Sequence, residues 1–536
     1  MDRRTWLVDK TGKKMSVKSR VYHLGQSWFD FAEFVKSHPI LAGITAAFLA
    51  LVYAGQAFSN YFYIDKEQLV NNPGSFYNWN EIGRFGLILV KKLLNLSWYN
   101  PYLGGILLLV TLWLSAMAAG YLFYSVDKWF GAVPLGIFIL LFLIYPTYVD
   151  QFLFQYQAFE VMLAVLFLLV SDWYLVRAVR EQDNVAFAAS VPLVVVAYGI
   201  YQNMASIQMC LYLGIFLLMV YEQKADKKIV RALIVRDMLH FVITLAGYAA
   251  IAVFFWKAEG NYLGEQVGWG RGILATLRSI FYYFGMLVVS DGVYYTRAYV
   301  VCCLTGIAAL FFLVKRLGKN AFWFALGLAG VAVSPLFMSI LMGGLIVPRI
   351  QMTLPLANAV LWLFAFRVIC TEVNEHRKGA ARVLAVLIGG MLIFMNAAPM
   401  VRMFYTRDVI GKADEMMTTV IVSDLGRFPS SAAGKPVIFL GHRDALTNPV
   451  CSEPDRTDSC VFISAYEVQY FFEPRYFFST YRIIGYWKTL GYDWFCGPTA
   501  EMMPLAYEHG AEMPAYPCTG YIEEFDDYII VKLGQE

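Results

Sequence analysis

Long apolar segments recur along the whole chain, and they constrain its fold more than any other feature. A run of about 20 apolar residues is long enough to cross the hydrocarbon core of a bilayer as a helix. Charged residues make up only 15% of the chain, against roughly 25% in an ordinary soluble protein. The sequence therefore predicts an all-α polytopic membrane protein with about 11 transmembrane helices, near residues 40–60, 101–124, 130–148, 155–176, 185–203, 204–222, 238–257, 296–314, 320–346, 350–371 and 382–400.

Lysine and arginine gather in alternate loops between these spans. When the spans are threaded back and forth, the N-terminal tail shares one side with four basic segments: RAVREQD, KADKKIVRALIVRD, KRLGKN and EHRKGAAR. Because basic loops stay in the cytoplasm, we expect the N-terminus inside and the C-terminus outside. The tail MDRRTWLVDKTGKKMSVKSR has no apolar core behind it, so we expect no cleaved signal peptide. A net charge of +3 gives no reason to expect nucleic acid as a partner.

This topology predicts three regions. Residues 1–37 form a cytoplasmic segment with an interfacial helix, residues 38–400 form the transmembrane domain, and residues 401–536 form an extracytoplasmic domain. In the last region KPVIFLGH and DDYIIVKL have the apolar, β-branched composition of strands, which predicts a small α/β domain. Within the transmembrane domain, we expect residues 61–100 and 258–295 to be external loops.

Four cysteines fall in the predicted external domain: Cys451, Cys460, Cys496 and Cys518. Oxidising compartments permit disulfides, so we expect up to two bridges there. Spacing alone leaves the pairing open. A zinc site is the alternative interpretation, but the four thiols contain no CxxC pair. The six histidines form no HExxH arrangement either, which argues against a zinc hydrolase.

Candidate catalytic residues follow the first apolar run, in YFYIDKEQLVNNPGSFYNWNEIGRFG at 61–86. Asp65 and Glu67 are placed outside by the topology, and an ionised carboxylate beside a sugar hydroxyl can act as a general base. A D-x-E pair can also hold Mg²⁺ or Mn²⁺ beside a phosphate, although the sequence specifies no certain cofactor. On spacing alone, a simpler interpretation is that the two acids cap an interfacial helix. The following GLILVKKLL predicts such a helix, with Lys91 and Lys92 on its polar side.

Further polar residues are expected on the same outer surface. Arg84, Lys91 and Arg349 are candidates for binding a lipid phosphate, since cations pair with phosphate oxygens. Anchoring a helix end is the alternative for Arg349, but the helix-breaking Gly343, Gly344 and Pro348 before it favour phosphate binding. A second group provides candidates for acceptor binding or for lining a cavity: Glu81, Asp150, Glu160, Gln202 and Arg271. Taken singly, Gln202 has the simpler interpretation of capping a helical hairpin. For the 258–295 loop, a gate over a lipid-facing cleft and an inert interfacial helix are equally compatible with the sequence.

Several short motifs together resemble one bacterial family. They are Asp65-x-Glu67, YNWNEIGRFGLILVKKLL, IYQN at 200–203, PRIQ at 348–351 and the closing MPAYPCTGYIEEFDDYIIVKL. In order and spacing, this set is similar to the polyprenyl-phosphate-dependent family of bacteriophage serotype-converting O-antigen glucosyltransferases and their relatives in Gram-positive genomes. The resemblance extends from the first span to the C-terminus.

The resemblance implies a GT-C architecture and an inverting transferase in the bacterial cytoplasmic membrane. Such an enzyme moves a sugar, glucose or another hexose, from a polyprenyl-phosphate monosaccharide to a surface polysaccharide on the outer side. A companion polyprenyl-phosphate glycosyltransferase and a flippase are the partners it implies. Asp65 would be the general base and Glu67 would orient the acceptor or hold a cation, while Arg84 and Arg349 would neutralise the lipid phosphate. The alternative is a transporter or flippase of lipid-linked sugars, which explains the helices but not the external acids.

Overall fold

The computed structural model describes residues 17–60, 66–96, 98, 100–222, 227–255, 267–290, 293–441, 471 and 477–534. The chain forms two compact units. The first takes Met1–Phe58, Asn78–Leu94 and Leu103–Met400, and the second takes Ser59–Tyr77, Asn95–Tyr102 and Val401–Glu536. The segment between the first two apolar runs is therefore shared between the units.

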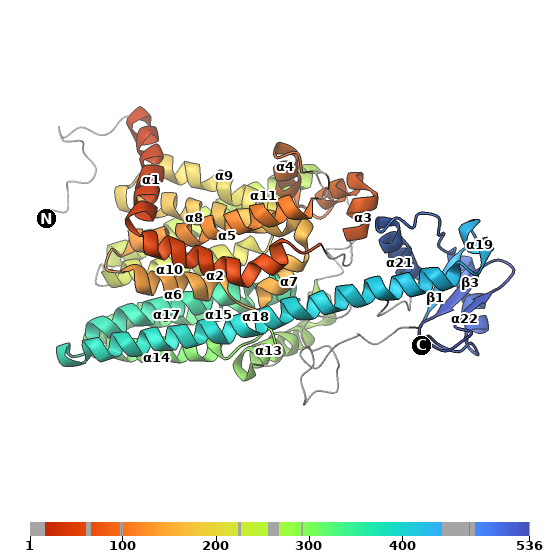
Figure 1. Ribbon diagram of the computed structural model, residues 1–536. Coiled ribbons are helices and arrows are strands. Elements are labelled where there is room, and N and C mark those ends of the chain that lie inside the picture. The colour runs from red at the N-terminus through yellow and green to blue at the C-terminus, as the bar shows by residue number, and fades with distance from the viewer. Residues whose placement is uncertain are drawn as a thin grey trace. The chain divides into compact units, whose positions relative to one another are not determined.

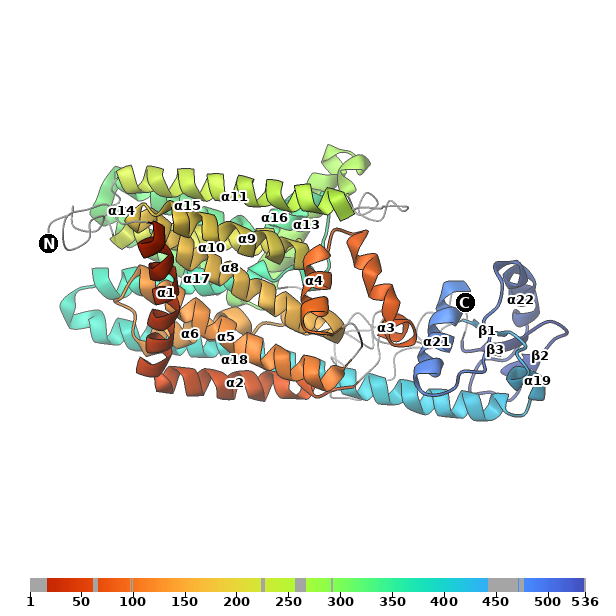
Figure 2. The same cartoon turned by 90° about the horizontal axis from the view of Figure 1, so that it is seen from above.

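The first unit is a bundle of apolar helices, confirming the predicted all-α membrane architecture (Figures 1 and 2). Its helices are α1 (Val17–Ser37), α2 (Pro39–Ala57), α4 (Phe85–Leu93), α5 (Pro101–Val126), α6 (Ala132–Leu143), α7 (Thr147–Leu153), α8 (Gln155–Glu181), α9 (Asn184–Ile200), α10 (Met204–Glu222), α11 (Lys227–Phe255), η2 (Gly268–Arg271), α13 (Ile273–Val289), α14 (Ala298–Leu317), η3 (Gly318–Ala321), α15 (Phe322–Val333), η4 (Ser334–Leu336), α16 (Phe337–Met342), η5 (Pro348–Ile350) and α17 (Thr353–Glu372), with the first part of α18 (Glu375–Leu425).

Burial separates the central helices from the peripheral ones. In α10 and α17, 89% of the most apolar part of the helix is buried. The corresponding share is 17% in α11 and 33% in the stretch from Ala298 to Met342. Helices that are apolar all round belong in the interior of a bundle or against lipid. Helices α10 and α17 therefore form the core of the unit, while α11 and α14 present apolar faces suited to lipid.

The number of spans differs from the prediction of about 11. Within the described residues, 8 helices are long and apolar enough to cross a membrane, or 9 if α6 and α7 count as one span bent by 55°. Two other places account for the difference. Helix α9 has only 17 residues, and the stretch from Ala298 to Met342 counts as one span, although Gly318 (φ +52°) breaks it between α14 and α15. Every predicted span nevertheless coincides with helix.

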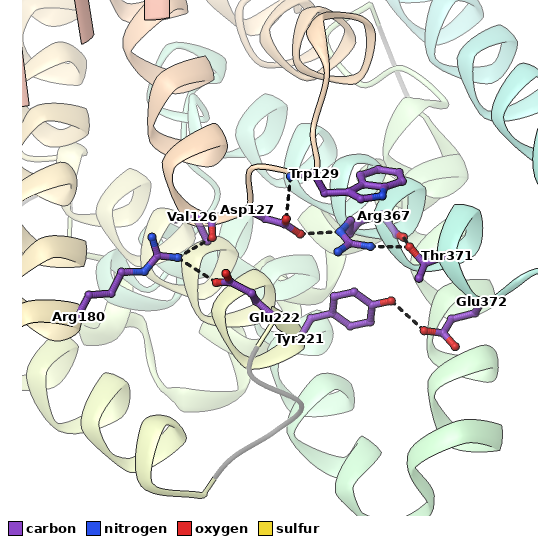
Figure 3. Close-up of polar contacts among 9 residues, drawn as sticks. All are labelled: Val126, Asp127, Trp129, Arg180, Tyr221, Glu222, Arg367, Thr371 and Glu372. Atoms are coloured by element: carbon purple, nitrogen blue, oxygen red, sulfur yellow. Dashed lines mark hydrogen bonds and ion pairs between the residues drawn. The ribbon is translucent and has the colours of Figure 1, made fainter. Parts of the chain in front are cut away.

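Arg367 and Arg180 connect the helix ends at one end of the bundle, and we call this group of contacts the arginine closure. Figure 3 shows Arg367 of α17 paired with Asp127, whose carboxylate lies 2.5 Å from the guanidinium. The guanidinium carbon also lies 4.5 Å from the ring centre of Trp129 and 5.0 Å from that of Tyr221. Tyr221 in turn donates to Glu372 at 2.8 Å. Planar guanidinium groups suit such combined pairing and stacking, so this cluster links the ends of α5, α10 and α17.

A second arginine extends this closure (Figure 3). Arg180 of α8 donates to Val126 O at 2.6 Å and to Glu222 at 2.9 Å. Arg236 of α11 donates to Ala178 O, so α8 and α11 also meet here. Cations at helix C-termini are favourable because carbonyl groups there lack partners. The basic segments that the sequence assigns to the cytoplasm thus gather at one end of the unit; which side of the membrane this end faces stays a prediction.

The second unit contains the small α/β fold predicted from its strands. Strands β1 (Val437–Leu440), β2 (Ile522–Glu524) and β3 (Ile529–Lys532) form a sheet in the order β1-β3-β2, with β1 parallel and β2 antiparallel to β3. Val437 pairs with Ile529, and Ile522 with Val531. The helices of this unit are α3 (Lys66–Asn71), α19 (Pro429–Ala432), α21 (Phe477–Thr489), η6 (Ala500–Met502) and α22 (Met503–Gly510), with the end of α18; η1 (Pro73–Asn80) crosses the boundary between the units.

Side chains alternate across this sheet, which explains why β1 is wholly apolar. On one face, Phe439 and Val531 pack with Trp487 of α21 and Leu425 of α18. On the other, Ile438, Leu440 and Ile530 pack with Met503 and Ala506 of α22. Because successive strand residues point to opposite faces, a strand covered on both sides must be apolar throughout.

Candidate functional site

Helix α4 forms one side of the candidate site, at the opposite end of the first unit from the arginine closure (Figures 1 and 2). Leu87, Ile88 and Val90 are buried, since α4 packs on α9. Glycine permits this close approach: a Cβ at Gly86 would lie 2.5 Å from Val196 O, and one at Gly199 would lie 2.6 Å from the Phe85 ring. This helix is therefore docked into the bundle on one face.

The prediction that both lysines of α4 lie on a polar surface is wrong for Lys91. Its ammonium lies 2.7 Å from Glu160 of α8, and both residues are buried. The ammonium also lies 5.8 Å from the ring centre of Trp79, which stacks on Tyr156 at 5.4 Å and 14°. Lys92 is exposed, as expected. A charge buried in a membrane protein needs a partner, and Glu160 supplies it.

Arg84 precedes α4 and lies against α8 and the α9–α10 turn. It donates to Gln157 Oε1 at 3.1 Å, and its guanidinium carbon lies 4.8 Å from the ring centre of Tyr201. Its buried Nε has no partner among the described residues. Gln202 fixes the preceding turn by donating to Ile82 O at 2.5 Å. Arg84 thus keeps donor capacity for a ligand while its plane is held in place.

Arg349 and Asp150 meet across α7 and η5. The Arg349 N–H donates to Asp150 Oδ2 at 2.9 Å, and its guanidinium carbon lies 4.9 Å from the ring centre of Phe154. Asp150 is buried, whereas Arg349 is half-buried. The carboxylate therefore positions the backbone of PRIQ, as expected for a buried acid that accepts N–H groups.

Several buried polar atoms at this end have no hydrogen-bond partner within the described part of the chain. They lie on Thr147, Tyr148 and Gln151 of α7, on Glu160 (Oε2), on Asn203 (Nδ2) and on Gln351 (Oε1). Buried polar groups in native proteins nearly always have partners, often ordered water or a ligand. Unused hydrogen-bonding capacity of this kind suits the hydroxyl groups of a sugar.

Sequence reasoning missed most of these side chains. Thr147 and Tyr148 fall at the end of the predicted span 130–148, and Gln151 falls in the short loop predicted at 149–154. The structure instead buries this segment as the seven-residue helix α7 after a 55° bend. The available signal was the presence of several polar residues within an apolar stretch, since polar groups in a membrane interior are costly and usually functional.

Glu81 and Arg271 lie apart from these contacts. Both side chains are exposed, and neither makes a hydrogen bond or ion pair with another described residue. Arg271 ends η2, which Trp269 holds on α16 by donating to Ile340 O at 3.0 Å. Of the 258–295 loop, residues 258–266 and 291–292 lie outside the described residues.

Glu67 belongs to the second unit, where α3 packs on α21. Asn71 donates to Gly485 O at 2.8 Å, and a Cβ at Gly485 would lie 3.1 Å from Glu67 Cγ. Glu67 and Lys66 are both buried. Burial lowers the pKa of Lys66 well below its ordinary value, and the neighbouring Arg407 lowers this pKa further. Asp65 lies outside the described residues.

Comparison with known proteins identifies the family. The sequence profile of the glucosyl transferase GtrII family matches residues 56–367, more than half of the chain. The chain belongs to this family. No curated protein and no solved structure matches it.

Membership in the GtrII family implies a membrane glucosyltransferase with a lipid-linked sugar donor, in a bacterial membrane. The matched region contains the whole polar cluster from Arg84 to Gln351, together with Asp65 and Glu67. It ends before α18, so the sheet of the second unit and the helices α19, α21 and α22 lie beyond it. The family resemblance predicted from short motifs is therefore confirmed.

The four candidate disulfide cysteines all fall in the second unit. Cys496 and Cys518 are exposed and form no disulfide with another described cysteine, and Cys451 and Cys460 lie outside the described residues. Among the described residues, no group of three or more His, Cys, Asp or Glu side chains is arranged to hold a metal ion. The predicted disulfides stay predictions.

Proposed function

We propose that this GtrII glucosyltransferase transfers glucose from a polyprenyl-phosphate glucose to a cell-surface polysaccharide, outside the cytoplasmic membrane and with inversion at the anomeric carbon. The family match over residues 56–367 carries this proposal. The polar cluster around α4 and α7 supports it, because Arg84 and Arg349 both contact side chains at the start of α8, near buried polar atoms that have no described hydrogen-bond partner. These are the groups that an anionic lipid phosphate and a sugar require.

Arg84 and Arg349 bind the donor phosphate in this proposal. Each guanidinium is oriented by an aromatic ring, and the Nε of Arg84 is unused within the described chain. Guanidinium groups bind phosphate oxygens in pairs of hydrogen bonds. Lys91 takes a different role from the one its sequence suggested, because Glu160 already compensates its charge. It anchors α4, and therefore Arg84, to α8.

The glucosyl group forms hydrogen bonds with the polar side chains of α7 and of the neighbouring residues. Gln151 offers both its amide oxygen and its amide nitrogen, and Gln351 its amide oxygen. Gln351 is already fixed, because its Nε2 donates to Ile346 O at 2.9 Å. Preorganised groups of this kind can bind hydroxyls without further loss of side-chain entropy.

A carboxylate of the D-x-E pair acts as the general base. It accepts the proton of the acceptor hydroxyl while that oxygen forms a bond to the anomeric carbon of glucose, and the bond from this carbon to the phosphate oxygen breaks with its electron pair. Polyprenyl phosphate leaves as the anion. Attack opposite the leaving group inverts the anomeric configuration. We assign the base role to Asp65 and the positioning of the acceptor to Glu67.

A reconstituted transfer assay tests this function. Purified full-length protein in lipid vesicles should move glucose from synthetic polyprenyl-phosphate glucose to the host polysaccharide. Asp65→Asn should nearly abolish turnover, and Arg84→Gln should lower it by about 100- to 1000-fold, as expected for a lost contact to transition-state charge. Lys92→Gln, an exposed change on α4, is the matched control.

Two outcomes would refute the proposal. Full transfer by both Asp65→Asn and Glu67→Gln would exclude a carboxylate base from this pair. Movement of the labelled lipid across the vesicle without any transfer would instead identify a transporter of lipid-linked sugars.

A further inference from the structure

We infer that the loop from Gly491 to Pro498 in the second unit binds the acceptor polysaccharide through Trp494 and Asp493. This inference rests on the proposed function for its choice of ligand. Trp494 is 42% exposed, and the adjacent Asp493 is exposed as well. This loop lies beyond the region that the family profile matches, so family membership assigns it no role.

The base of the loop is fixed to the folded core. Tyr492 N–H donates to Trp487 O at 3.0 Å, and Val437 N–H of β1 donates to Cys496 O at 2.9 Å. Between these two anchors, Phe495 is buried with its ring 5.0 Å from that of Trp487. The backbone is thus held on both sides of Trp494, and the partly exposed indole rests against the rings of Tyr492 (5.6 Å) and Phe495 (5.5 Å).

Tyr481 of α21 fixes the far end of the loop. Its hydroxyl donates to Pro498 O at 2.8 Å. A Cβ at Gly497 would lie 2.8 Å from the Tyr481 ring, so the close packing of loop on ring requires glycine. Tyr481 is itself 44% exposed. Two exposed aromatic rings, on α21 and on the loop, therefore belong to one rigid substructure.

This combination of side chains has the chemistry of a carbohydrate-binding surface. Aromatic rings provide flat apolar area at low entropic cost and a polar edge, which suits the apolar face of a sugar ring. Asp493 makes no hydrogen bond or ion pair with another described residue, so its carboxylate is available to accept hydrogen bonds from sugar hydroxyls.

A lipid headgroup layer is the other environment in which exposed Trp and Tyr are common. The carboxylate of Asp493 disfavours it, because the surface of a bilayer containing anionic lipids repels negative charge. A rigid loop is also unnecessary for lipid, which adapts to any apolar side chain. A glycan, by contrast, requires the ring and the carboxylate to keep a fixed separation.

The test measures acceptor binding and acceptor kinetics separately. The probe is end-labelled surface polysaccharide purified from host cells that lack this protein, and the protein is the full chain in lipid nanodiscs. Trp494→Ala should weaken binding about tenfold, the upper range for a lost aromatic contact, and should raise the KM for acceptor while leaving kcat and the KM for donor unchanged. Trp494→Phe should restore most of the affinity, and Asp493→Asn should weaken binding less.

Leu505→Ala is the matched control, since Leu505 is 46% exposed in the same unit on α22. Equal affinity of wild type and Trp494→Ala for the polysaccharide would overturn the inference. An equal loss in Leu505→Ala would do the same, as would reduced binding of Trp494→Ala to protein-free anionic vesicles with unchanged glycan binding. Because binding is measured without turnover, a protein that binds the glycan through Trp494 but transfers no glucose would refute the proposed function and leave this inference standing.

Discussion

Lys91 and Glu160 illustrate, at the scale of single residues, how a buried partner determines what a charge can do. The two side chains form an ion pair of 2.7 Å with almost no exposure. Removing one partner of such a pair leaves an uncompensated buried charge, which costs about 3–5 kcal/mol, whereas replacing both with apolar groups is often neutral. Their pairing therefore contributes specificity of α4 docking more than net stability.

We accordingly expect Glu160→Gln to destabilise the protein by about 3 kcal/mol. The double variant Lys91→Met, Glu160→Met should unfold at a temperature close to that of the wild type. Thermal unfolding of the detergent-solubilised protein, followed by circular dichroism, would measure both. A double variant that is less stable than Glu160→Gln would contradict this account of the pair.

The charged residues of this site could be recognised from sequence, but their partners could not. Lys91 pairs across 69 positions, and Arg84 bonds Gln157 across 73. A pattern of apolar and polar residues determines which face of a helix is buried locally, but it does not reveal which distant helix supplies the partner. For this reason the amphipathic pattern of GLILVKKLL placed Lys91 on the wrong side.

At the scale of elements, close helix packing at glycine positions Arg84. Helix α4 approaches α9 where Gly86 faces Gly199, and a Cβ at Gly86 would lie 2.5 Å from a backbone oxygen. Backbone atoms cannot yield as a flexible side chain can, so any larger residue must separate the two helices.

We expect Gly86→Ala to lower stability by about 1–3 kcal/mol and to reduce glucosyl transfer more than stability, because it shifts Arg84. Gly55→Ala in α2 is the control, since nothing lies within 4 Å of its Cβ position; it should be neutral or stabilising by up to about 1 kcal/mol, as expected for replacing a helical glycine. Chemical unfolding and the transfer assay together measure the two effects. Loss of activity in Gly55→Ala together with full activity in Gly86→Ala would contradict the argument.

Helices were predictable where apolar runs are long, and less so where they break. The strands VIFL and IIVK and the long spans follow directly from composition and length. The break after α6 depends on tertiary burial of polar residues in α7, and the end of α14 depends on Gly318 at φ +52°. The predicted span 130–148 therefore continued across the first break, whereas the second break falls between the predicted spans 296–314 and 320–346, where the basic segment KRLGKN indicates a loop.

At the scale of the whole molecule, the second unit should respond to pH through Lys66. Burial holds the pKa of this lysine in the folded protein well below the ordinary value of 10.5. Between these two values the unfolded chain binds a proton that the folded chain lacks, so the free energy of unfolding rises with pH across this window.

We expect Lys66→Met to be more stable than wild type at neutral pH, with the difference shrinking as the pH approaches 10.5. Urea unfolding of both proteins at several pH values, followed by tryptophan fluorescence, would measure this. A constant difference across the pH range would show that Lys66 does not titrate between the folded and unfolded states in this window.

The predicted orientation also belongs to this scale. Cys496 and Cys518 are exposed, while Cys210, Cys302 and Cys370 are buried in helices of the first unit. If the C-terminal domain lies outside the membrane, a membrane-impermeant maleimide should label it in intact cells. Labelling that requires prior reduction would indicate disulfides with Cys451 or Cys460, and labelling only in lysed cells would contradict the orientation.

The central claim is that this membrane protein adds glucose to a surface polysaccharide. Linkage analysis of that polysaccharide, from host cells with and without the protein, tests it most directly. The account predicts glucosyl branches of one linkage and inverted configuration relative to the donor, present only when the protein is present and lost in Asp65→Asn. Identical polysaccharides from the two strains, each expressing a functional donor pathway, would contradict it.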